Sequence, residues 1–176
     1  QNDRLFPKTK VTINLAREIY QEIVELPIIS PHGHCDPTWF SKNLRFPDPA
    51  QLFVVPDHYV YRMLVSQGIS LAEVGVNSLD DSSFEKDPRK IWKKFSENYK
   101  LFRGTPTAMW LDYSFEKIFG ISEPLTLDNS EFYFNHIEEK LAKPEFLPQA
   151  LFDNFRIEVL ATTDSALSNL QQHAEI

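Results

Sequence analysis

The chain has 176 residues, enough for one domain with a sizeable core, and its 42% hydrophobic and 13% aromatic residues indicate a globular protein. Its net charge of -7 does not favour a nucleic-acid partner, and no apolar run approaches the roughly 18 residues that a membrane span needs. One cysteine excludes an internal disulfide, and the start, Gln1–Arg4, lacks an apolar signal region, so we expect a cytoplasmic protein without a membrane partner.

The first predicted element is an amphipathic helix over residues 11–26, because apolar side chains recur there at helical spacing. The apolar run Leu26–Ile29 is short, partly β-branched and interrupted by proline, so it predicts a buried strand. The segment Pro-His-Gly-His-Cys-Asp-Pro follows at residues 31–37. It is the most informative stretch of the chain.

His32 and His34 stand two positions apart directly after this strand. Strand side chains alternate between faces, so both imidazoles should point the same way, and two imidazoles on one face can bind one metal ion. The same pattern also occurs in loops with solvated histidines. The strand before it and the helix start predicted by Asp36–Pro37 favour a site at the turn of a βα unit. Cys35 could be a nucleophile or a thiolate ligand, but in an extended turn it would face away from the histidines.

Further helices follow, each with its own cap. Asp57 predicts a helix that runs to Gln67 and stops at Gly68, and Ser70–Glu73 forms a capping-box pattern before Gly75. Residues 80–83 indicate a solvated loop. Helices are also predicted to begin at Asp87–Pro88 and to run from Thr105–Pro106 to Gly120. Two more are predicted over about 130–142 and from Pro148 to about Asn154. A strand over 157–162 and a helical tail from Ser165 follow. Four aromatic residues at helical spacing are expected in the core: Trp92, Phe95, Trp110 and Phe115.

Several segments, taken in order, resemble one known family. The segment Leu26–Phe40 closely resembles the first strand and turn of the uronate (glucuronate) isomerases, in the amidohydrolase superfamily. The other similar segments are Asp3–Pro7, Asp57–Leu64, Phe102–Pro106 and Glu158–Asp164. Ordered matches from about residue 3 to the last residue are far more specific than one His-x-His pair.

The resemblance implies an α/β fold, the amidohydrolase-type TIM barrel. This chain should itself be mostly α-helical, with barrel strands one and two and a helical insertion between them. The implied domains are 1–40 with strand one and the metal motif, 41–155 as the inserted subdomain, and 156–176 with strand two. A barrel needs eight strands and about 250 residues. We therefore expect the chain to be the incomplete, amino-terminal portion of an isomerase.

The implied activity is aldose–ketose isomerisation of hexuronates by proton transfer through an enediol. The substrates would be D-glucuronate, giving D-fructuronate, and D-galacturonate, giving D-tagaturonate. His32 and His34 would hold a divalent metal, with zinc favoured, bound weakly because a catalytic zinc normally has three protein ligands. By the same resemblance His58 and Tyr59 would lie over the substrate. Tyr59 would donate or relay a proton, and His58 would hydrogen-bond a sugar hydroxyl or the carboxylate.

Other residues and functions stay open at this point. Arg62 could bind a substrate carboxylate, pair with Asp57 or lie free on the surface, and Arg103 could bind an anion or close a helix end. Asp164 is interpreted as a helix cap, and His136 and His173 as exposed helix residues that are not ligands. The alternatives are metal-dependent hydrolysis, or a non-catalytic helical fragment that associates with itself. Unpaired strand edges and apolar faces favour a homo-oligomer in either case, whereas the isolated chain should be inactive.

Overall fold

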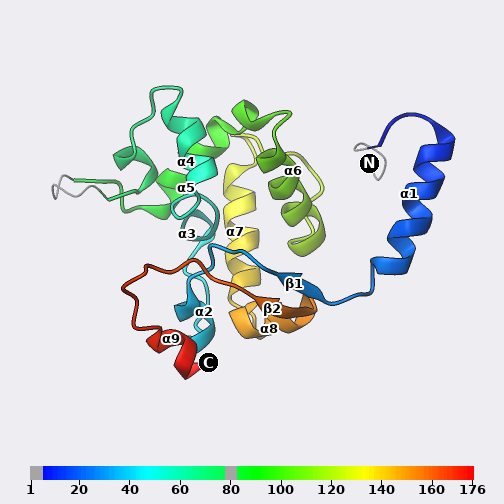
Figure 1. The fold of residues 1–176 in the computed structure, drawn as a ribbon. Coiled ribbons are helices and arrows are strands. Elements are labelled where there is room, and N and C mark those ends of the chain that lie inside the picture. The colour runs from blue at the N-terminus through cyan, green and yellow to red at the C-terminus, as the bar shows by residue number, and fades with distance from the viewer. Residues whose placement is uncertain (1–5, 78–82) are drawn as a thin grey trace. The chain divides into compact units, whose positions relative to one another are not determined.

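The computed structural model describes residues 6–77 and 83–176, so most of the loop predicted at 80–83 lies outside the described residues (Figure 1). The chain divides into two compact units. The strand unit comprises Gln1–Lys42 and Gln149–Ile176, and the helical unit comprises Asn43–Pro148. The described chain is mostly helical, as the sequence predicts.

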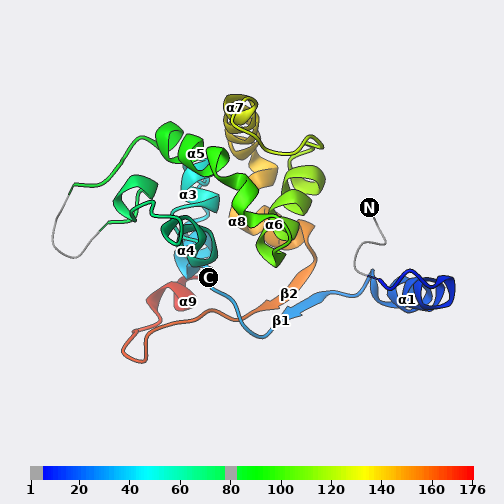
Figure 2. The same ribbon diagram turned by 90° about the horizontal axis from the view of Figure 1, so that it is seen from above.

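The strand unit is organised around two short parallel strands, β1 (Ile28–Ser30) and β2 (Ile157–Leu160). Both views of the ribbon show them side by side (Figures 1 and 2). Ser30 pairs with Leu160, and the Ala161 amide donates a hydrogen bond to the Ser30 carbonyl at 2.9 Å. The segments that follow β1 and β2 therefore begin side by side. The helices are α1 (Lys10–Ile23), α2 (Pro37–Lys42), α8 (Pro148–Asn154) and α9 (Gln171–Glu175).

Two predictions for the strand unit are wrong. β1 was predicted as a buried strand, yet Ile28 is 49% and Ile29 62% exposed, because β2 is its only strand neighbour among the described residues. The tail was predicted helical from Ser165, yet α9 begins only at Gln171. Leu170 has a left-handed backbone with φ of 53°, which a helix cannot continue through.

The helical unit consists of short capped helices. Asp57, Asp87 and Thr105 each accept a hydrogen bond from the first turn of the helix that follows, as predicted. Gly68, Gly75 and Gly120 all have positive φ at the predicted stops. The elements are α3 (Pro49–Phe53), α4 (His58–Val65), η1 (Ala72–Val74), α5 (Pro88–Glu97), η2 (Tyr99–Phe102), α6 (Pro106–Tyr113), η3 (Ser114–Ile118), α7 (Ser130–Leu141) and η4 (Pro144–Phe146).

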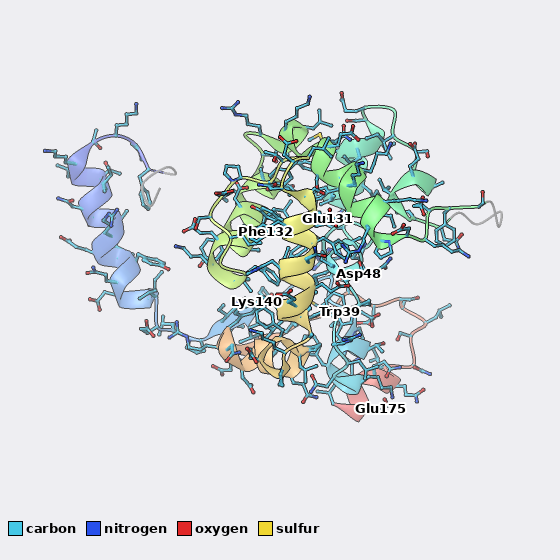
Figure 3. The ribbon with its side chains drawn as sticks, turned by 180° about the vertical axis from the view of Figure 1, so that it is seen from behind. Trp39, Asp48, Glu131, Phe132, Lys140 and Glu175 are labelled. Carbon is cyan, nitrogen blue, oxygen red and sulfur yellow. The ribbon has the colours of Figure 1, made fainter. Side chains whose placement is uncertain are left out.

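Aromatic side chains from α5, η2, η3 and α7 form the core of the helical unit. Trp92, Phe95 and Phe115 are at most 1% exposed, which confirms three of the four predicted core aromatics. Trp110 is 56% exposed, so that prediction is wrong. Leu111 faces inward, and successive helical residues lie about 100° apart, which turns Trp110 outward. On α7 the labelled Phe132 likewise points away from the buried face (Figure 3).

Candidate functional site

The turn after β1 brings the two predicted histidines together. The Nε2 atoms of His32 and His34 lie 3.1 Å apart, and the two rings meet edge to face with centroids 4.9 Å apart. Their nitrogens therefore converge on one point instead of facing opposite sides of the chain. Without a metal ion between them, the N–H of one ring can donate a hydrogen bond to the unprotonated Nε2 of the other. The two rings then have complementary tautomers.

This spacing fits two ligands of one metal ion. Zinc–nitrogen bonds of about 2.0 to 2.1 Å at a tetrahedral angle place two ligand nitrogens about 3.3 Å apart. The observed 3.1 Å therefore needs only a small adjustment of the rings. Within residues 6–77 and 83–176 no third histidine, cysteine or carboxylate completes a metal-binding group. The described chain thus offers two of the three protein ligands that a catalytic zinc usually has.

The turn between the histidines contacts the segment that follows β2. The Thr163 hydroxyl donates a hydrogen bond to the Gly33 carbonyl at 2.8 Å. A β-carbon on Gly33 would lie 2.8 Å from the Ala161 carbonyl oxygen, so only glycine fits this close approach. The sequence predicts that Thr163 and Asp164 follow the second strand, on the side where barrel sites form, but it predicts no contact for Thr163.

The rest of the motif forms a helix start. The Asp36 carboxylate accepts a hydrogen bond from the Thr38 amide at 2.8 Å and caps α2, which begins at Pro37 as predicted. Burial raises the pKa of the half-buried Cys35 thiol above its usual value. The thiolate, which is both the nucleophile and the metal ligand, is therefore disfavoured at Cys35.

His58, Tyr59 and Arg62 lie on the first turns of α4, in the helical unit. The Asp57 carboxylate caps the helix by accepting from the Tyr59 amide at 2.8 Å. The rings of His58 and Tyr59 lie against each other, with centroids 4.2 Å apart, and Tyr59 is 55% exposed. Arg62 is exposed and makes no ion pair with Asp57 in the described part of the chain. The structure therefore groups these residues as one polar, accessible helix start.

The remaining candidates have other roles. Asp164 was interpreted as a helix cap, but no helix begins there; its carboxylate accepts from the Thr162 hydroxyl and lies 3.6 Å from His173. Thr162 and His173 line a cavity of about 510 Å³ in the strand unit. His136 was predicted to be exposed but is partly buried, because its Nε2 forms a hydrogen bond of 2.8 Å with the Phe119 carbonyl. Arg103 is exposed at the end of η2.

A comparison with known families decides what kind of chain this is. A family model described as glucuronate isomerase matches residues 8–176. The chain belongs to the glucuronate isomerase family. Among curated members it is 53% identical over 174 residues to the uronate isomerase of Rhizobium meliloti (strain 1021), and 50% identical to that of Mesorhizobium japonicum. Each alignment covers 99% of this chain and 37% of the relative.

Solved structures of the family share the fold of this chain. The crystal structure of glucuronate isomerase from Caulobacter crescentus matches 99% of the chain with a TM-score of 0.94 at 46% identity. Uronate isomerase from Thermotoga maritima matches 92% with a TM-score of 0.80 at 26% identity. The chain spans 36% and 34% of these two proteins. It therefore corresponds to little more than a third of a family member. None of the helices described is long and apolar enough to cross a bilayer.

Proposed function

We propose that this chain is the amino-terminal part of a uronate isomerase that interconverts aldose and ketose forms of hexuronates. The substrates would be D-glucuronate, giving D-fructuronate, and D-galacturonate, giving D-tagaturonate. The observation that carries the proposal is the convergence of the His32 and His34 Nε2 atoms, 3.1 Å apart, at the end of β1 in a chain of this family. Such a pair can hold a divalent metal, for which zinc is our choice because it binds imidazole readily.

The reaction moves a proton between C2 and C1 of the sugar through an enediol. It needs an acid–base group near these carbons and a means of stabilising negative charge on the neighbouring oxygen. The bound metal would supply the second as a Lewis acid. We assign the first to Tyr59, whose accessible hydroxyl can donate or relay a proton. The His58 ring lies against the Tyr59 ring, and we assign to His58 a hydrogen bond to a sugar hydroxyl of the substrate.

Recognition of the uronate carboxylate is assigned to Arg62 and His58. Arg62 is exposed and lies one turn after His58 on the same helix. A guanidinium group can bind a carboxylate through two parallel hydrogen bonds, which fixes its orientation as well as its charge. The carboxylate is the group that distinguishes a uronate from a neutral sugar, so this contact would select for uronates.

The fold of the longer protein would be the amidohydrolase-type TIM barrel. β1 and β2 pair in parallel, and more than a hundred residues of helices separate them in sequence. In our proposal they are barrel strands one and two, with an inserted subdomain over 41–155 and flanking segments 1–40 and 156–176. The histidines then stand at the carboxyl end of strand one, the end where TIM-barrel sites form.

We also propose that copies of the chain associate in the cytoplasm, with neither nucleic acid nor membrane as a partner. On α1, the apolar residues Leu15, Ile19 and Ile23 are each at least half exposed. An antiparallel pair of α1 helices from two copies would bury these apolar side chains.

The activity is tested by following D-glucuronate with proton NMR in the presence of zinc. Two samples are compared: this 176-residue chain and a longer polypeptide that extends it to the full length of its relatives. We expect D-fructuronate from the longer polypeptide and almost none from the chain alone, because two ligands hold the metal weakly. A longer polypeptide that hydrolyses amide or ester substrates, and leaves D-glucuronate unchanged, would support hydrolysis and refute the isomerase proposal.

A further inference from the structure

The turn that carries the two histidines is held by contacts with the segment that follows β2. Two contacts meet at Gly33, one of them the close approach to the Ala161 carbonyl and the other the hydrogen bond from the Thr163 hydroxyl. The strands before these segments run side by side (Figure 1). We propose that Thr163 is a positioning residue that aligns the His32 and His34 rings for metal binding, an inference that rests on the metal site of the proposed function.

The physical link is the peptide plane between Gly33 and His34. The Gly33 carbonyl and the His34 amide belong to one rigid planar group. A hydrogen bond of 2.8 Å to that carbonyl therefore restricts rotation of the plane, and with it the direction in which the His34 side chain leaves the backbone. Gly33 has no side chain to restrict this rotation by itself. Thr163 restrains this plane from the segment that follows β2.

His32 is held by its own strand. The Ser30 hydroxyl donates to the His32 carbonyl at 3.2 Å, and the Ser30 carbonyl accepts from the Ala161 amide at 2.9 Å. One histidine is thus tied to β1, and the other to the segment after β2. The 3.1 Å separation of their Nε2 atoms depends on both ties. Loss of the Thr163 bond should loosen the peptide plane between Gly33 and His34 and so change the alignment of the His34 ring with the His32 ring.

The neighbouring threonine offers a matched control. The Thr162 hydroxyl contacts Asp164 and His173, at 2.7 Å from the His173 Nε2, and does not contact the histidine turn. Adjacent residues of an extended segment face opposite sides, which explains the different partners. Thr162→Val and Thr163→Val therefore remove the same hydroxyl from adjacent positions. Thr163→Ser keeps the hydroxyl and should behave like the unchanged chain.

The role is also distinguishable from a purely structural one. Thr163 is exposed, so its hydrogen bond competes with water and should add little to global stability. We expect the unfolding temperature of Thr163→Val to stay within about 2 °C of the unchanged chain, since exposed substitutions are usually worth less than about 0.5 kcal/mol. The alignment of the two rings should change nonetheless.

The experiment measures ring alignment without metal and zinc affinity with it, both on the 176-residue chain. Nuclear Overhauser contacts between the His32 and His34 rings should disappear in Thr163→Val and persist in Thr163→Ser and Thr162→Val. Calorimetric zinc affinity should fall about 10-fold in Thr163→Val alone, the lower end of what outer contacts to metal ligands contribute.

The outcomes distinguish a failure of the Thr163 positioning role from a failure of the proposed metal site. Unchanged ring contacts in Thr163→Val would overturn the positioning role, whatever the chain does with zinc. Zinc binding that is lost in His34→Ala but equal in Thr163→Val and the unchanged chain would keep the metal site and overturn only the inference. A third outcome is that the ring contacts depend on Thr163 but the chain binds no zinc. This would confirm that Thr163 aligns the rings and would refute the proposed metal site.

Discussion

Gly33 and Ala161 approach each other so closely that a β-carbon on Gly33 would lie 2.8 Å from the Ala161 carbonyl oxygen. The obstacle is backbone, which cannot move aside as a flexible side chain can. Glycine between the two histidines is therefore a packing requirement of the β1–β2 pair.

Gly33→Ala should consequently separate the two strand ends. We expect a loss of stability of about 1–3 kcal/mol, the usual cost of overpacking a tight contact, together with amide chemical-shift changes over residues 30–35. Gly104→Ala is the control, because nothing lies within 4 Å of the added β-carbon and its cost comes from the positive φ of 84°. That variant should leave the shifts of residues 30–35 unchanged. Identical shifts in both variants would mean that the contact with Ala161 does not shape the turn.

Zinc binding by the isolated chain should need both histidines of the turn. His32→Ala removes one of two convergent ligands, so calorimetry should detect no zinc binding above the non-specific background. His136→Ala should bind like the unchanged chain, because that ring bonds the Phe119 carbonyl in the helical unit. A loss of binding in His136→Ala, with none in His32→Ala, would assign the zinc to a different place.

Tyr99 should make the stability of the helical unit depend on alkaline pH. Burial first, and then the hydrogen bond to Asp112, raise the pKa of Tyr99 well above the ordinary value of 10. Below pH 10 the hydroxyl is neutral in both states and its stabilisation is complete. Above pH 10 the unfolded chain releases a proton that the folded chain keeps, so the free energy of unfolding falls as pH rises.

Tyr99→Phe should remove much of this alkaline loss. At neutral pH the variant should be less stable by about 1 kcal/mol, the typical net value of one hydrogen bond. Urea unfolding at pH 7 and at pH 10.5 measures both effects. Tyr113→Phe is the control, since Tyr113 is 62% exposed and should change neither value appreciably. A Tyr99→Phe chain with the full alkaline loss would show that other groups cause it, among them Tyr133, whose pKa is raised to about 12.

Self-association should depend on the apolar face of α1. Ile19 and Phe132 are both 56% exposed, one on α1 and the other on α7. Ile19→Lys should shift the sedimentation profile from dimer towards monomer because a charge replaces apolar contact area, whereas Phe132→Lys should leave it unchanged. Equal profiles for Ile19→Lys and the unchanged chain would remove α1 from the interface.

Local signals in the sequence predicted most helices because caps and stops act within a few residues. Asp57, Asp87 and Thr105 cap the expected helices, and Gly120 ends its segment with a φ of 77°. Exposure was harder to predict, because it depends on which neighbours cover a face. The apolar Ile29 and Trp110 are both exposed for that reason. The sequence indicated the histidine pair, but the contact between Gly33 and Thr163 joins residues 130 positions apart and has no local signal.

The most direct test of the account is the rate at which the longer polypeptide converts D-glucuronate to D-fructuronate with and without the Tyr59 hydroxyl. Tyr59→Phe should lower kcat by about 10²–10⁴-fold, the usual contribution of a general acid–base group. Tyr61→Phe, two positions further along α4, should keep the unchanged rate. Equal rates for Tyr59→Phe and Tyr61→Phe would contradict the mechanism, and no conversion by the unchanged polypeptide would contradict the assignment of an isomerase.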